Sequence, residues 1–184
     1  MDFSQADVDA IIGTAKDVGI NTIDTAECYG DHLSEALVGK AIEGQREQWT
    51  LATKFGHHFH DVFERDRAFG PKDVVKQLDA SLKALRTDYV DLYQFHSGSD
   101  DEFATEGLWE ALAEEVQKGK IRHLGISIGA NDNAWQTQQA SEVGASVVQV
   151  VYNRLQREPE EAVFPACERH HLGVLARVPL ASGF

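Results

Sequence analysis

Residues 71–96 read PKDVVKQLDASLKALRTDYVDLYQFH, and this stretch decides the fold class. Its first part, Pro71–Leu85, carries apolar residues at helical spacing and has proline in the first turn. Its second part, Tyr89–His96, is a short run of aliphatic and aromatic residues, which is typical of a strand. We therefore predict a helix followed by a strand that ends on His96.

The same alternation of strand and helix extends along the whole chain. Strands are predicted at 21–26, 49–55, 89–96, 120–127, 146–153 and 173–179. Helices are predicted at 4–18, 34–42, 71–85, 108–116, 133–143 and 159–170. Parallel strands need crossover connections, and helices of this length provide them. The pattern therefore predicts a single α/β domain over residues 1–184, with about six parallel strands covered by helices.

Two parallel-sheet architectures compete for this pattern. A doubly wound nucleotide-binding fold carries a glycine-rich turn, and neither G-x-G-x-x-G nor G-x-x-x-x-G-K-[ST] occurs in the sequence. Polar residues instead recur at the ends of successive strands, as they do around the mouth of a barrel. These residues are Asp24, Lys54, His96, Ser127 and Gln149. The sequence thus favours a (β/α)8 TIM barrel. The barrel is expected to be partial, because the 184 residues are fewer than the roughly 250 of a complete one.

Composition excludes several classes of function. A formal net charge of -13 argues against binding to nucleic acid, which requires clustered Lys and Arg. No stretch approaches the roughly 18 consecutive apolar residues of a membrane helix, and the N-terminus has no pattern of a secretory signal. Cytoplasmic residence is therefore expected. The only two cysteines, Cys28 and Cys167, are far apart in the sequence and are predicted to be free thiols.

Four residues at or just beyond the predicted strand ends carry a recognisable chemistry. They are Asp24, Tyr29, Lys54 and His96. A tyrosine beside an ammonium group becomes a better proton donor, and a histidine can hydrogen-bond a carbonyl substrate. Any one of these residues alone is more often structural than catalytic. As a set on one rim of a β/α unit they indicate acid catalysis.

Three histidines, His57, His58 and His60, crowd a short segment that suggests a metal site, because histidine is a common metal ligand. No matching pattern of carboxylates or cysteines accompanies them in the sequence. A solvated or substrate-facing loop is therefore the favoured interpretation, and no metal is predicted.

Several motifs in consistent order resemble the aldo-keto reductases. The matching segments are residues 19–26, Tyr29-Gly30, Ser34-Glu35, 52–56, 88–96, 119–122, 125–127, Gln149, Tyr152-Asn153 and 179–181. The resemblance implies a (β/α)8 barrel that binds NADPH, with NADH not excluded. It also implies an NAD(P)H-dependent oxidoreductase that reduces a small aldehyde or ketone to an alcohol.

The resemblance also implies roles for individual residues. Tyr29 would donate a proton to the developing alkoxide, and Lys54 would supply the cation that makes the phenol more acidic. Asp24 would hold the ammonium group in place, and His96 would orient the carbonyl oxygen. The implied cofactor-binding residues are Asp24, Ser127, Gln149, Arg177, Pro179, Leu180 and Ala181.

The cofactor positions include two departures from the family pattern. Ser127 and Gln149 match positions that hold the nicotinamide carboxamide, and residues 179–181 match the loop along the pyrophosphate. Ile128 stands where many members have asparagine. Arg177 stands where many have an aromatic residue, although a guanidinium group also stacks on planar rings.

Aligned to the family, the chain begins after the first barrel strand and stops after the seventh. The resemblance therefore implies a barrel truncated at both ends, with unpaired edge strands around Asp24 and Ala176. It also implies that basic residues for the adenosine 2′-phosphate are missing. Two alternatives to an enzyme stay open: a non-catalytic, cofactor-binding regulatory or partner subunit, and an inactive fragment. Neither the substrate nor the oligomeric state follows from the motifs.

Overall fold

A parallel sheet forms the centre of the molecule. The structure, a computed structural model, describes residues 3–61 and 64–183. Six strands follow one another in the order β1-β2-β5-β6-β7-β8, and each pairs in parallel with its neighbour. Their bounds are β1 Thr22–Asp24, β2 Thr50–Phe55, β5 Val90–His96, β6 Ile121–Ser127, β7 Ala145–Val151 and β8 Gly173–Arg177. This sequential order confirms the predicted partial TIM barrel.

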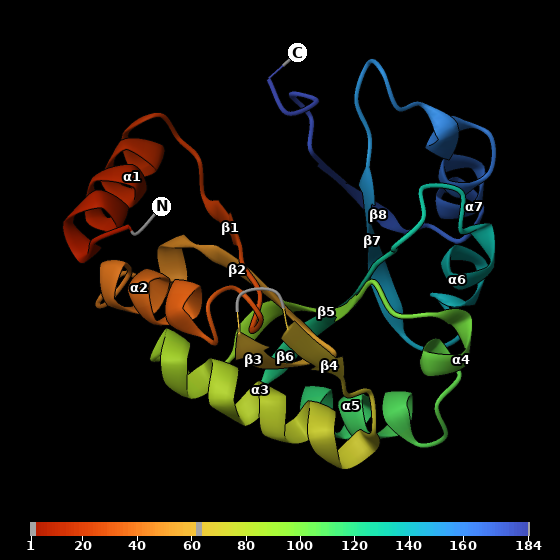
Figure 1. Ribbon diagram of the computed structural model, residues 1–184, viewed down its shortest axis with the longest axis horizontal. Coiled ribbons are helices and arrows are strands. Elements are labelled where there is room, and N and C mark those ends of the chain that lie inside the picture. Colours follow the sequence, from red (N-terminus) through yellow and green to blue (C-terminus); the bar gives the residue numbers. More distant parts are fainter. Residues whose placement is uncertain (1–2, 62–63, 184) are drawn as a thin grey trace.

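Helices follow the strands and lie on the outer side of the curled sheet (Figure 1). They are α1 Gln5–Asp17, α2 Leu33–Ala41, α3 Pro71–Leu85, α4 Asp100–Phe103, α5 Leu108–Gln117, α6 Ala134–Gln139 and α7 Val163–Arg169, with short 3₁₀ helices at Arg46–Gln48 and Glu158–Glu160. No helix in the described ranges is long and apolar enough to cross a membrane. The sheet forms an open arc whose edge strands are β1 and β8, as the resemblance implied.

Helix α3 and strand β5 show how the sequence builds the core. Val74, Leu78 and Leu85 recur at helical spacing and are buried on the inner face of α3. Tyr93 is fully buried, and its hydroxyl donates to the Val74 carbonyl oxygen over 3.3 Å. Side chains alternate along a strand, so the outward direction of Tyr93 implies that the next residue, Gln94, points into the arc. Aromatic and aliphatic residues therefore fill the layer between sheet and helices, and polar residues face the concave side.

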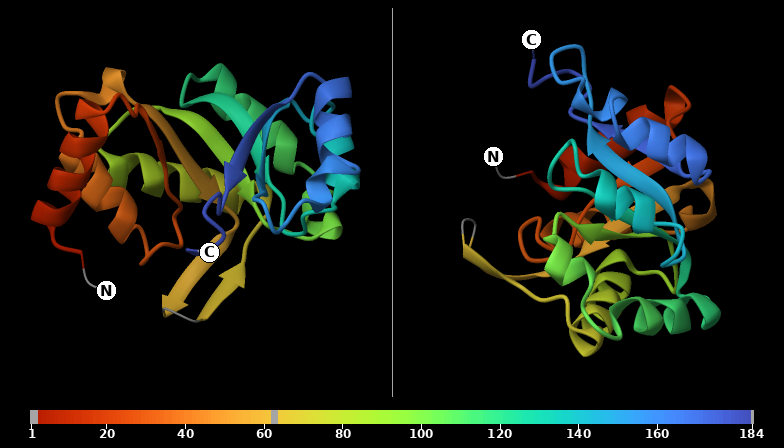
Figure 2. Two further views of the ribbon diagram at one scale, coloured as in Figure 1. Left: turned by 90° about the horizontal axis from the view of Figure 1, so that it is seen from above. Right: turned by 90° about the vertical axis from the view of Figure 1, so that its right-hand side faces the viewer.

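The β3–β4 hairpin (His57–Asp61 and Glu64–Arg67) was not predicted, because its segment was assigned to a loop. The two strands pair in antiparallel fashion and project from the edge at which the parallel strands end (Figure 2). Most of its residues are exposed, and no hydrophobic alternation marks the strands. Polar contacts cross the hairpin instead, such as the 2.8 Å contact between His60 Nε2 and Asp66 Oδ2.

Several predicted boundaries also shift, among them those of α6 and β7. Helix α6 ends at Gln139 rather than at residue 143. Strand β7 ends at Val151 rather than at Asn153, whose side-chain oxygen accepts from the backbone amides of Leu155 and Gln156. An asparagine that bonds the backbone just ahead of it stabilises a turn, which ends the strand.

Candidate active site

An ion pair between a buried lysine and a partly exposed aspartate joins the first two strands at the rim. Asp24 ends β1 and Lys54 lies one residue before the end of β2. The Lys54 side chain is buried, and its Nζ donates to Asp24 Oδ2 over 2.8 Å and to the Thr25 carbonyl oxygen over 2.7 Å. A buried ammonium group needs such acceptors to offset its loss of hydration. The two residues therefore fix each other's position.

Side chains of three further strands connect to Asp24, two of them directly and the third through Gln149. Gln94 Nε2 donates to its Oδ1 over 3.0 Å, and Gln149 Nε2 donates to its Oδ2 over 3.1 Å. Ser127 Oγ donates to Gln149 Oε1 over 3.2 Å. The structure thus brings the predicted residues Ser127 and Gln149 to the Asp24–Lys54 pair. Gln94 was missed, although its spacing of two residues from His96 places both side chains on one face of β5.

Tyr29 stands on the loop between β1 and α2. The backbone of Gly30, Asp31 and His32 has positive φ angles there, so the chain turns tightly into the helix. The Tyr29 ring is half-exposed and lies nearly perpendicular to the His96 ring, at a centroid distance of 6.2 Å. Lys54 Nζ lies 5.5 Å from the centre of the same ring. All four predicted catalytic residues therefore meet around one volume at the rim.

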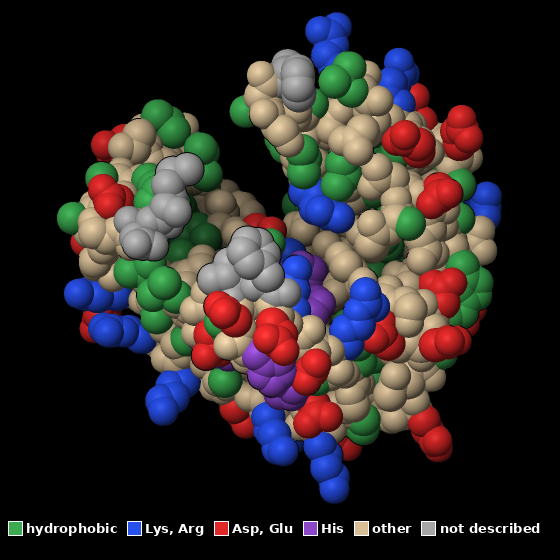
Figure 3. Space-filling view, viewed as in Figure 1, with side chains coloured by type: hydrophobic (Ala, Val, Ile, Leu, Met, Phe, Trp, Pro, Cys, Tyr) green, Lys and Arg blue, Asp and Glu red, His purple; other side chains and the backbone are tan. Residues whose placement is uncertain are grey.

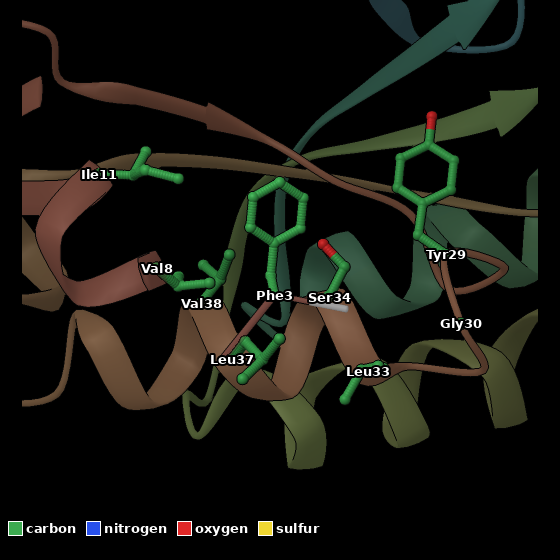
Figure 4. Close-up of a pocket in the computed structure, with 9 residues that line it drawn as sticks. All are labelled: Phe3, Val8, Ile11, Tyr29, Gly30, Leu33, Ser34, Leu37 and Val38. Atoms are coloured by element: carbon green, nitrogen blue, oxygen red, sulfur yellow. The ribbon is translucent and has the colours of Figure 1, made fainter. Parts of the chain in front are cut away.

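Two cavities adjoin Tyr29. An apolar groove of about 550 Å³ lies between α1 and α2 and contains Tyr29 but none of the other three catalytic candidates. Figure 4 shows that the Tyr29 hydroxyl points away from Leu33 on α2. The groove is lined by Phe3, Val8, Ile11, Tyr29, Gly30, Leu33, Ser34, Leu37 and Val38.

The second cavity, of about 440 Å³, combines Tyr29 with His96 and is the better candidate for a substrate site. It is lined by Tyr29, His57, Arg65, Arg67, His96, Ser97 and Arg177. Figure 3 shows Lys, Arg and His side chains gathered in the hollow between the two arms of the arc. We call this space the arginine cavity.

The surroundings of His96 keep its imidazole neutral. Burial, and next the positive charge of Lys54, lower its pKa to about 3. At neutral pH the ring therefore carries one N–H donor and one acceptor nitrogen. Such a ring can donate a hydrogen bond to a carbonyl oxygen without adding a charge to the site.

The pKa of Tyr29 differs from the sequence-based expectation. Burial, and next the negative charge of Asp24, raise the pKa of the phenol, whereas Lys54 was expected to lower it. The main physical reason is that burial disfavours the charged phenolate, and the Asp24 carboxylate, which is paired with Lys54, adds to this effect. Tyr29 is therefore protonated at neutral pH, which a proton donor requires.

The remaining cofactor candidates separate into two groups. Arg177 ends β8 and lines the arginine cavity, and its buried Nε has no hydrogen-bond partner within the described residues. Pro179, Leu180 and Ala181 lie in the turns beyond β8, and Pro179 lines a different cavity together with Tyr152. The structure thus brings Arg177 to the catalytic candidates but does not bring residues 179–181 to them.

Sequence reasoning did not place Glu27 and Cys28 beside His96. Glu27 is buried, and its Oε1 accepts from the backbone N–H of His57 over 3.0 Å. Cys28 Sγ lies 3.7 Å from His96 Nδ1 and accepts from Arg65 Nη1 over 3.3 Å. Burial raises the pKa of the Cys28 thiol. The only sequence signal was that Glu27 and Cys28 immediately precede Tyr29.

The fold and this rim define a class of protein. The model of the Aldo/keto reductase family matches residues 2–184, and the chain belongs to that family. Among curated proteins, it is 37% identical to aldo-keto reductase YhdN of Bacillus subtilis, covering 94% of this chain and 51% of that protein.

Solved structures agree with this assignment. The holo form of aldo-keto reductase AKR11C1 from Bacillus halodurans superposes with a TM-score of 0.90 at 32% identity, covering 98% of this chain and 59% of that one. An aldo-keto reductase from Klebsiella pneumoniae in complex with NADPH gives a TM-score of 0.78 at 30% identity, covering 96% and 59%. The chain therefore spans between 51% and 59% of the length of these relatives.

Proposed function

We propose that this chain carries the active site of an NADPH-dependent reductase that converts an aldehyde or ketone to an alcohol. The observation that supports the proposal best is that Tyr29 and His96 line one cavity, with the buried Lys54 ammonium group 5.5 Å from the centre of the Tyr29 ring and bonded to Asp24. Family membership supports carbonyl reduction in general. The proposal adds the specific reaction, NADPH as the cofactor and Tyr29 as the proton donor.

Each residue has a role that follows from its surroundings. Tyr29, protonated at neutral pH, transfers its proton to the carbonyl oxygen as negative charge develops there. The neutral His96 ring donates a hydrogen bond to the same oxygen and orients the substrate. Lys54 places a positive charge beside the Tyr29 ring, where it stabilises the phenolate that proton transfer leaves behind. Asp24 holds that ammonium group in place.

The polar residues between the strands fit the nicotinamide end of the cofactor. Ser127 and Gln149 present a hydroxyl and an amide at the rim, beside Asp24. The unpartnered buried Nε of Arg177 offers a further donor. The reduced nicotinamide, when bound, supplies the hydride. NADPH is the proposed cofactor because a relative binds it, and NADH is retained as the alternative.

The arginine cavity points to a carbonyl substrate that carries an anionic group. Arg67 is paired with Glu102 over 2.6 Å, but Arg65 and Arg177 form no salt bridge with any residue of ranges 3–61 and 64–183. A guanidinium group recognises carboxylate or phosphate through paired hydrogen bonds. We propose that Arg65 faces the anionic end of the substrate while Tyr29 and His96 bind the carbonyl oxygen.

The decisive experiment measures NADPH oxidation with a panel of small aldehydes, for the parent chain and for Tyr29→Phe. Loss of a general acid costs about 10²–10⁴-fold in rate, so the variant should lose turnover while it still binds NADPH. Equal rates would exclude Tyr29 as the proton donor. NADPH binding without turnover in the parent chain would favour the regulatory subunit, and neither binding nor turnover would favour the inactive fragment. Cytoplasmic residence and the lack of nucleic-acid partners stay predictions from the sequence.

A further inference from the structure

Four side chains with metal-binding atoms meet behind Tyr29. They are Glu27, Cys28, His57 and His96, and one ligand atom of each lies within 4.8 Å of the other three. Glu27 and Cys28 follow β1, His57 begins β3, and His96 ends β5. None of these residues is exposed. Four donors from three separate segments therefore face one small volume.

The distances between these atoms are close to those of a tetrahedral metal site. Cys28 Sγ is 3.7 Å from His96 Nδ1, and Glu27 Oε2 is 4.0 Å from the same nitrogen. His57 Nδ1 is 3.3 Å from Glu27 Oε1. Zinc bonds of about 2.0–2.3 Å keep neighbouring ligand atoms about 3.3–3.7 Å apart. Because the four ligand atoms lie up to 4.8 Å apart, side-chain shifts of about an ångström would complete the coordination.

An unpartnered oxygen independently indicates a ligand at this place. Glu27 is 2% exposed, and its Oε2 has no hydrogen-bond partner among the residues the structure describes. A buried carboxylate oxygen without a partner is costly, whereas a bound cation would satisfy it. Because Oε2 faces His96, the missing partner belongs inside the cluster.

We propose that Glu27, Cys28, His57 and His96 bind a divalent transition metal, with zinc as the best match. Zinc takes thiolate, imidazole and carboxylate ligands in tetrahedral sites, whereas calcium and magnesium prefer oxygen ligands alone. One carboxylate and one thiolate would also balance its two positive charges. Arg65, which now bonds Cys28 Sγ, opposes a cation here, as do the positive charges of Lys54 and Arg177 that act on His96. The Arg65 side chain lies on the exposed strand β4 and lines the arginine cavity, so it can turn from the sulfur toward that cavity when the metal takes the sulfur.

The proposed metal would lock the hairpin to the barrel rim. His57 belongs to the β3–β4 hairpin, whereas His96 belongs to the central sheet, so one ion would cross-link the two. Coordination through Nδ1 of His96 would also fix the remaining ring proton on Nε2. Metal binding and the resulting gain in thermal stability can therefore be tested independently of the proposed reductase activity.

The first test uses cobalt as a spectroscopic probe for zinc. The chain is titrated with Co²⁺ under a phosphine reductant, and the thiolate-to-cobalt charge-transfer band is followed in the near ultraviolet. One equivalent should produce the band in the parent chain, and added Zn²⁺ should abolish it. Absence of the band would overturn the proposal without any variant.

The second test compares variants by zinc calorimetry and by thermal unfolding. Cys28→Ser and His57→Gln each remove one ligand, so zinc affinity should fall by more than the roughly 10–100-fold that the loss of an outer partner costs. His58→Gln, an exposed neighbour on β3, is the matched control and should bind as the parent does. Zinc should raise Tm in the parent and in the control but not in the two ligand variants. Equal zinc affinity in all four proteins would assign binding to another place and overturn the proposal.

Discussion

Gln149 on β7 donates a hydrogen bond to Asp24 on β1 over 3.1 Å. Three strands, β2, β5 and β6, lie between these two in the sheet. The bond can form only because the sheet curls until its first and fifth strands face each other across the concave side. The carboxylate that holds Lys54 is therefore anchored from opposite sides of the arc.

Gln149→Leu tests this anchor. The substitution keeps the approximate size of the side chain but removes the bonds to Asp24 and Ser127. Hydrogen bonds to charged groups contribute about 1.5–3 kcal/mol, and the partial exposure of Asp24 places the expected loss at the lower end. Urea unfolding measures it, and NADPH affinity should fall in parallel. Gln138→Leu, at an exposed position of α6, is the control. Equal losses of stability in both variants would show that the bond from Gln149 to Asp24 does not stabilise the fold.

Lys54→Met removes the buried ammonium group and leaves Asp24 with its two amide donors. We expect reduction to slow by about 10²-fold or more, because the phenolate left by Tyr29 loses its neighbouring positive charge. Steady-state kinetics should show this loss in kcat rather than in KM. Lys76→Met on the exposed face of α3 should keep the parent rate. An unchanged kcat in Lys54→Met would remove the lysine from the mechanism.

Arg65→Gln tests the proposed substrate class. The variant should raise KM for aldehydes that bear a carboxylate by about tenfold or more, because a charge-assisted hydrogen bond is lost. KM for neutral aldehydes of similar size should stay the same. Arg86→Gln, whose guanidinium pairs with Glu43 far from the arginine cavity, is the control. A uniform change across both aldehyde classes would argue against anion recognition by Arg65.

The free energy of unfolding should depend on pH through His32. Its hydrogen bond to the buried Glu35 is the main cause that raises the pKa of the imidazole, with smaller contributions from Asp31 and Glu27, while burial lowers it. The folded pKa lies above the unfolded value of about 6.5, so the stabilisation is complete below that pH. It is lost as the pH rises through the folded pKa.

His32→Gln measures this contribution. Urea unfolding should show the largest difference between parent and variant near pH 6, and the difference should shrink by pH 9. His123→Gln is a control at an exposed position of β6. If the difference between parent and His32→Gln instead grows with rising pH, the sign of the linkage is wrong.

Two glycines on neighbouring helices should respond to alanine in opposite directions. A Cβ at Gly39 in α2 would lie 2.5 Å from the backbone carbonyl carbon of Leu85, so α2 and α3 pack too closely there for any side chain. Gly39→Ala should destabilise the fold by about 1–3 kcal/mol through overpacking. A Cβ at Gly13 in α1 meets nothing within 4 Å, so Gly13→Ala should stabilise it by about 1 kcal/mol. Thermal unfolding distinguishes the two, and destabilisation by both would contradict the reason given.

The sequence alone predicted the fold class and named the candidate residues that the structure places at the rim. Helical spacing in Pro71–Leu85 and the strand that ends on His96 are local patterns, and a parallel order follows from their alternation. The strand ends also identified Asp24 and Lys54, because parallel strands bring their carboxyl ends to one rim. Helices, strands and their ends are properties of short segments, so the spacing of apolar residues in the sequence is enough to predict them.

Only the tertiary structure decided which polar groups meet. The raised pKa of Tyr29 depends on burial and on Asp24, and neither is visible from the residues around the tyrosine. Glu27 and His57 are 30 positions apart, and the hairpin that contains His57 has no hydrophobic alternation to predict it. Contacts between distant segments arise from packing and from the curl of the sheet. The fold was therefore readable from local patterns, whereas the electrostatics of the site were set by the packing of the whole chain.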